Sequence, residues 1–130
     1  STDAKPVIKL ENSGNNVNSP QIVMLNSSTA NDDDKSGTIR FKGMNDAGTP
    51  EEIEYGTIYV HNQDVSDGTE DSDMYFRTMA AGSLASRLVI SSDKIGIGTS
   101  SPVYGLDVRN TGYFATASSS NQCIKYKTKW

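Results

Sequence analysis

The sequence contains a single cysteine and a single histidine among its 130 residues. Cys123 alone excludes a disulfide within the chain and a metal site built from several thiolates, so it is interpreted as a small strand residue. His61 alone excludes a paired-histidine metal motif, and neither a nucleophile elbow nor a phosphate-binding loop occurs. We therefore predict that the chain is not an enzyme and holds no cofactor and no metal.

Apolar residues are also scarce. They make up 35% of the chain, and the mean hydropathy is −0.53, whereas an ordinary globular domain has roughly 45–50% apolar residues when glycine is counted. A chain of 14.0 kDa with this composition is poorly supplied for a core of its own. No apolar run approaches the roughly 18 residues of a membrane-spanning helix, so we expect no membrane insertion.

Basic residues are fewer than acidic residues, 12 against 16. The net charge is −4 and the pI is near 4.8, and the one basic cluster is Lys125, Lys127 and Lys129. Nucleic-acid binding needs a clustered basic surface that neutralises phosphates. We therefore expect no nucleic-acid partner.

Serine, threonine, asparagine and glycine, which favour turns and short strands, make up more than a third of the chain. Short β-type runs alternate with turn-forming clusters, and no pattern of a normal helix appears. Strands are predicted over residues 7–10, 21–26, 38–42, 53–61, 73–79, 87–90 and 122–130, with two short strands around the Ser101-Pro102 turn. The predicted loops cover residues 11–19, 27–36, 43–52 and 63–72.

This pattern predicts an all-β fold with short antiparallel strands and long polar loops, either β-sandwich-like or an intertwined trimeric fibre segment. Three parts are expected: a β-rich domain over 1–92, a glycine-rich block over 93–110, and a linker with a terminal strand over 111–130. Because the ordering entropy must be offset by burial, a chain with few apolar residues either stays disordered or shares its core with other copies. The periodic strands favour a shared core.

Three segments carry a resemblance to a known family. They read PVIKLEN from Pro6, GTIRF from Gly37, and RLVISSDKIGIGTSSP from Arg87, the last being followed by Leu106-Asp107-Val108. Together they resemble phage tail-fibre and tailspike-like structural proteins over about residues 6–110. The glycine-rich block is the most specific part, because the earlier strands are generic.

The resemblance implies a homotrimeric virion protein of the tail fibre that contributes to host attachment, with other tail proteins and a host-surface glycan or envelope protein as partners. In this family the block commonly precedes a C-terminal chaperone that often cleaves itself at a serine. The 22 residues after Val108 lack the charged opening of that chaperone. No protease role is therefore carried over, and the chain is interpreted as a fragment or a processed product.

The alternating glycines of the block suggest a place where chains converge. Glycine permits a close approach of backbones that a bulkier residue prevents. We predict that Gly96 and Gly98 let three chains meet, with Ile95 and Ile97 pointing toward the shared axis.

An acidic stretch is a candidate calcium loop. It contains Asp64, Asp67, Glu70, Asp71 and Asp73, with Gly68 available for a sharp bend. Calcium prefers such oxygen ligands, but the spacing differs from that of an EF-hand. A solvated acidic loop is the preferred interpretation, as it is for residues 32–34.

Aromatic residues and carboxylates leave two further alternatives open. Tyr55, Tyr59 and His61 share one face of a predicted strand and either stack against a sugar or pack in a core, of which packing is preferred. Some tailspikes cleave polysaccharides with two acidic residues, and the candidates here are Glu52, Glu54, Asp64 and Asp73. A glycan-binding module or a polysaccharide depolymerase segment therefore remains the alternative to a purely structural fibre.

Overall fold

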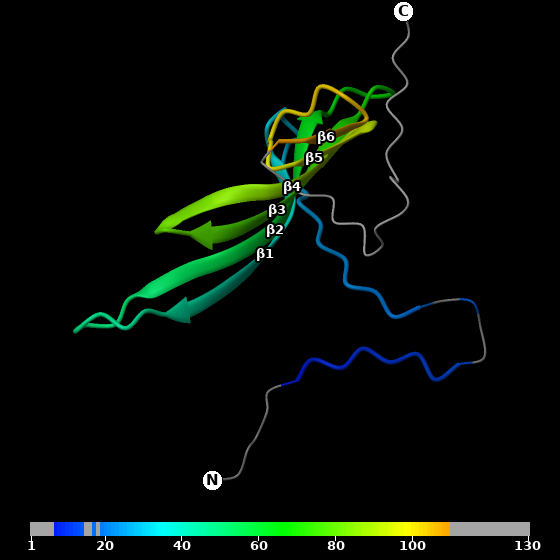
Figure 1. Cartoon of the computed structure of the whole chain (residues 1–130). Helices are drawn as coiled ribbons and strands as arrows, with labels where there is room; N and C mark the ends of the chain where they lie inside the picture. Colours follow the sequence, from blue (N-terminus) through cyan, green and yellow to red (C-terminus); the bar gives the residue numbers. More distant parts are fainter. Residues whose placement is uncertain (1–6, 15–16, 18, 110–130) are drawn as a thin grey trace, which may run out of the picture.

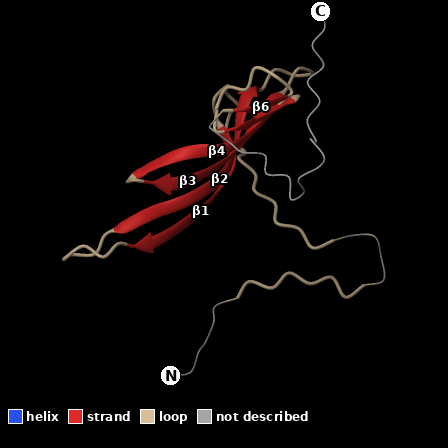
Figure 2. Cartoon of the chain, in the orientation of Figure 1, coloured by secondary structure: helices blue, strands red, loops and turns tan. Residues whose placement is uncertain are grey.

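Six strands and no helix form in the part of the chain that the computed structural model describes, residues 7–14, 17 and 19–109. The strands are β1 (Lys35–Met44), β2 (Glu52–Asp64), β3 (Asp71–Ala80), β4 (Ser83–Ser91), β5 (Lys94–Ile97) and β6 (Leu106–Val108). They lie in one sheet in chain order (Figure 1). The all-β prediction is confirmed, and Figure 2 shows strands joined only by loops and turns.

The first five strands form an antiparallel meander because short connections favour hairpins. The turn between β3 and β4 consists of Ala81 and Gly82, both with positive φ, which matches the twist of the flanking strands. The longer β1–β2 loop is closed by Asn45, whose side-chain oxygen accepts a hydrogen bond from the Glu51 amide at 2.8 Å. Local turn chemistry thus sets the order of the strands.

The last pair departs from the predicted antiparallel arrangement, because β5 and β6 run parallel. Residues 98–105 carry the chain back to the start of β5, where the Ile95 amide donates to the Gly105 carbonyl at 2.9 Å. Gly98 begins this return with a φ of 72°. The prediction of two short strands around a turn is confirmed, and their pairing extends the same sheet.

The strands predicted over residues 38–42, 53–61, 73–79 and 87–90 all lie within β1 to β4. The strands predicted over residues 7–10 and 21–26 are wrong for this chain, since neither segment forms one. Both segments carry β-favouring residues, but a strand also needs a partner that accepts its backbone hydrogen bonds. The strand predicted over residues 122–130 and the linker before it lie outside the described residues.

Candidate functional site

One face of the sheet is apolar across all six strands. The cross-strand register places two rows of side chains on it. One row is Ile39, Ile58, Phe76, Leu88, Ile97 and Val108, and the other is Gly37, Val60, Met74, Ile90, Ile95 and Leu106. We call these two rows the apolar face. No charged residue lies in either row.

The described part of the chain leaves much of the apolar face exposed. No residue of the two rows is buried, and the exposed ones include Ile39 at 43%, Ile97 at 44% and Leu106 at 58%. Monomeric proteins rarely leave a contiguous apolar patch of more than a few hundred Å² in contact with water. An uncovered face of this kind is typical of a surface that binds another protein.

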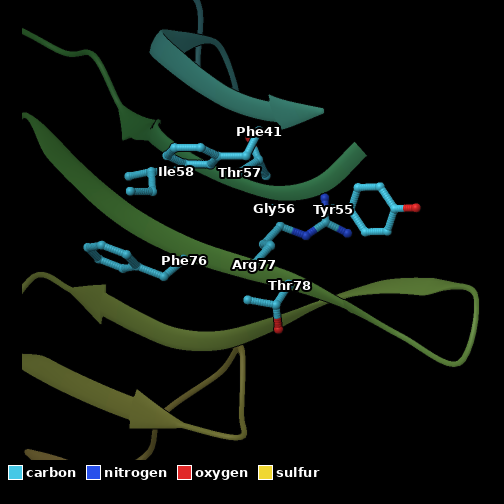
Figure 3. A pocket seen from close by; sticks show the side chains of 8 residues that line it. All are labelled: Phe41, Tyr55, Gly56, Thr57, Ile58, Phe76, Arg77 and Thr78. Atoms are coloured by element: carbon cyan, nitrogen blue, oxygen red, sulfur yellow. The ribbon is translucent and has the colours of Figure 1, made fainter. Parts of the chain in front are cut away.

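Two hollows shape the apolar face. The first, of about 320 Å³, lies over β1, β2 and β3, and Figure 3 shows the rings of Phe41 and Phe76 on either side of Ile58. The second, of about 250 Å³, is lined by residues that include Gly37, Ile39 and Met74. These hollows can receive apolar side chains.

The opposite face is largely closed. Tyr59 and Tyr75 stack there, with ring centroids 4.8 Å apart and planes 7° apart. Beside Tyr75 on the neighbouring strand lies Val89, the only buried apolar residue in the described part of the chain. Next in the same row come Gly96 and the buried Asp107. We call this row, with the residues that cover it, the closed face.

Gly96 contradicts the predicted role of the glycine-rich block. A Cβ on Gly96 would lie 2.8 Å from the Thr99 carbonyl oxygen and 3.4 Å from the Pro102 Cβ. Residues 98–105 of the same chain, which we call the return loop, therefore fill the space beside Gly96. Gly96 is thus in contact with its own chain and does not offer this space to a neighbouring chain. Ile95 and Ile97 nevertheless lie together on the apolar face, at 40% and 44% exposure.

A polar network occupies one end of the closed face. The Asp73 Oδ2 accepts hydrogen bonds from Gln63 at 2.5 Å and from the Tyr75 hydroxyl at 3.2 Å, while the buried Oδ1 has no partner. Gln63 also contacts the His61 ring at 3.1 Å, and the His61 Nε2 lies 3.4 Å from Asp33. Partial burial and the Asp73 carboxylate raise the pKa of Tyr75 to about 12. The neutral phenol is therefore held as a donor.

Asp107 and Arg109 fasten the return loop, and sequence reasoning missed both. The Asp107 carboxylate accepts a hydrogen bond from the Val103 amide at 3.0 Å and pairs with Arg109 at 2.9 Å. The Arg109 guanidinium, helped by the Val103 amide, lowers the pKa of Asp107. A carboxylate buried in this way is held by partners that satisfy its charge.

Three of the five carboxylates of the candidate calcium loop, those of Asp64, Asp71 and Asp73, each bond a different partner. Asp64 accepts from the Ser66 amide at 2.7 Å, and the Ser66 side chain together with this amide lowers the pKa of Asp64. Asp71 accepts from the Ser92 hydroxyl at 3.2 Å, Asp73 belongs to the polar network, and Asp67 is exposed. No group of three or more metal-ligating side chains that could hold an ion occurs in the described part.

The predicted aromatic platform is divided. Tyr59 is stacked against Tyr75, with the Lys35 Nζ 5.3 Å from the Tyr59 ring, whereas Tyr55 is 45% exposed near the end of the β1–β2 hairpin. His61 lies in the polar network. The structure thus brings Tyr59 and His61 together with Tyr75 and leaves Tyr55 apart.

Glu52 and Glu54 each face a basic residue of β1. The Glu52 carboxylate lies 2.6 Å from the Lys42 Nζ, which lowers the pKa of Glu52, and the Glu54 Oε2 lies 3.6 Å from the Arg40 Nε. Together with Asp64 and Asp73, both residues were candidates for glycan cleavage. All four have partners within the sheet and its turns.

No protein-family model matches the chain, and a comparison with curated proteins finds no match.

In the described residues, no helix is long and apolar enough to cross a bilayer.

Proposed function

We propose that the chain is a structural segment of a phage tail fibre, which assembles as a homotrimer and contributes to attachment of the virion to its host. The observation that supports this most strongly is the uncovered apolar face. It spans six strands without a charged residue, while a single apolar residue is buried in the described part of the chain. A layer of β-structure normally buries its apolar face against a second layer.

Other copies of the chain are the simplest source of that second layer. The described residues form one sheet, so a sandwich-like core requires sheets from different chains. Copies related by rotational symmetry present identical apolar surfaces to one another, and their burial favours association by roughly 25 cal/mol per Å² of area removed from water. The sequence resemblance to tail-fibre proteins favours three copies and a place in the virion.

Light scattering of the purified full chain tests the assembly. A homotrimer predicts three times the mass of 14.0 kDa for one chain, and a folded monomer at high concentration would contradict the proposal.

Antibodies raised against the chain test the location. They are expected to label the tail fibres of virions in electron micrographs, and labelling elsewhere would contradict the assignment to the fibre.

A further inference from the structure

A short apolar segment before β1 forms no strand, and its own chain leaves its apolar side chains exposed. It comprises residues 21–25, and its four apolar members are exposed: Ile22 by 68%, Val23 by 77%, Met24 by 47% and Leu25 by 80%. The odd-numbered pair is more exposed than the even-numbered pair. This alternation is typical of an extended segment with one side turned toward a surface.

Met24 identifies that surface. Its side chain lies over Gly37 of β1, where a Cβ on the glycine would be 2.9 Å from the Met24 Cβ and 3.2 Å from its sulfur. The Asn26 side-chain amide donates to the Lys35 carbonyl at 3.2 Å and holds the segment at the start of β1. Met24 also lines the hollow of about 250 Å³ on the apolar face. One side of the segment therefore rests on the edge of this face.

We propose that residues 21–25 form a two-sided strap, in which Met24 rests on its own β1 while Val23 and Leu25 pack on the apolar face of a neighbouring copy. This inference rests on the proposed homotrimer and adds a specific contact between neighbouring chains, from the strap of one chain to the apolar face of the next. The sequence predicts a strand over residues 21–26, and the single chain leaves that segment unpaired. A neighbouring copy supplies the missing surface.

The chemistry of both surfaces favours a second copy as the occupant. The apolar face carries no charge, and Val23 and Leu25 carry none, so identical chains meet there without placing like charges together. Of the charged side chains near the face, Lys42 is paired with Glu52, and Arg77, which lines the first hollow, donates a hydrogen bond to the Leu84 carbonyl at 2.8 Å.

Two charged variants of the full chain test the strap. Val23→Asp with Leu25→Asp places two carboxylates on its outer side, and Thr29→Asp with Ala30→Asp adds the same charge at exposed positions just beyond the strap. We expect the first variant to need at least about tenfold more protein to reach the trimer mass in light scattering, because it buries charge without partners. The control is expected to match the original chain, and circular dichroism would verify the sheet in both.

The other possible results of this experiment separate the strap from the homotrimer on which it rests. If the original chain is a monomer, the homotrimer and the strap are both wrong. If the original chain is a trimer and the Val23→Asp, Leu25→Asp variant assembles equally well, the strap alone is wrong. Equal weakening by the control variant would also overturn the strap, since added charge anywhere near this part of the chain would then be the cause.

Cross-linking between different chains shows which copy the strap touches. In a Cys123→Ser background, chains with Leu25→Cys are refolded together with chains that carry Met74→Cys on the apolar face. We expect a disulfide-linked pair in non-reducing gels, and none when Arg40→Cys replaces Met74→Cys. A cross-link that forms only within one chain carrying both Leu25→Cys and Met74→Cys would place the strap on its own sheet and overturn the inference.

Discussion

The two faces of the sheet are built from the same six strands but differ in how completely each is covered. On the closed face, Val89 is fully buried and Gly96 lies against the return loop. On the apolar face, the neighbouring residues Ile90, Ile95 and Ile97 are each 40–44% exposed. The closed face is covered by its own chain, whereas we propose that other copies cover the apolar face, so substitutions on the two faces should have different kinds of effect.

The largest effect is expected from charge on the apolar face. Ile39→Asp combined with Ile97→Asp should weaken association by about a hundredfold or more, because two carboxylates would be buried in the trimer without partners. Light scattering over a range of concentrations measures the change. Tyr104→Asp combined with Val7→Asp is the matched control, since the two residues are 71% and 77% exposed and lie outside the two rows. Unchanged assembly of the Ile39→Asp, Ile97→Asp variant would show that the apolar face is not the interface.

Truncation of adjacent residues separates the two faces further. Val89→Ala removes apolar contacts inside the closed face and should lower the free energy of unfolding by about 2 kcal/mol. Ile90→Ala, one position along on the apolar face, should instead raise the protein concentration at which the trimer forms, because we propose that its contacts lie between chains.

Light scattering over a range of concentrations, together with urea unfolding of both variants, measures this difference. Unchanged assembly of the Ile90→Ala chain, together with a lowered free energy of unfolding, would place Ile90 in the core of a single chain. Such a result would remove the distinction between the two faces.

Gly96 tests how the closed face is sealed. Gly96→Ala places a methyl group 2.8 Å from the Thr99 carbonyl oxygen, so the return loop must shift, at an expected cost of about 1–2 kcal/mol. Gly105→Ala is the matched control, because nothing lies within 4 Å of the added Cβ. Urea unfolding compares the two. Equal stability of both variants would show that Thr99 does not pack against Gly96.

Sequence periodicity predicted a strand well where the strands that pair with it in the sheet are also its neighbours along the chain. The alternation around Ile39, Ile58 and Phe76 marked three strands, and the turns between them required only local chemistry. Periodicity also carries the signal of the apolar face, since one side of every strand is apolar. The register that joins these sides into two continuous rows depends on bulges, such as the one between Phe41 and Lys42, which alternation alone does not reveal.

Other features lay beyond what composition and spacing provide. Gly96 was predicted to face other chains because glycine marks a close approach without naming the partner. The Asp107–Arg109 pair was missed because two residues near the end of a short strand resemble any exposed ion pair until the return loop buries the carboxylate. The segment at 21–25 has the propensity of a strand, but propensity does not supply a pairing partner.

The smallest expected effect comes from the Tyr75 hydroxyl on the closed face. The pKa of Tyr75 is raised from 10.0 to about 12 in the folded chain, so above pH 10 the unfolded chain releases a proton that the folded chain retains. The contribution of Tyr75 to the free energy of unfolding is therefore fully present below pH 10 and is lost as the pH rises toward 12. Tyr75→Phe should flatten this part of the stability profile, and Tyr55→Phe, at an exposed tyrosine, serves as the control. Urea unfolding at pH 9 and pH 11 provides the measurement, and an equal pH dependence in the Tyr75→Phe chain and the original would show that the hydroxyl is not held by Asp73. Because solvent screens a half-buried group, the change should be smaller than those expected at Val89 and Gly96.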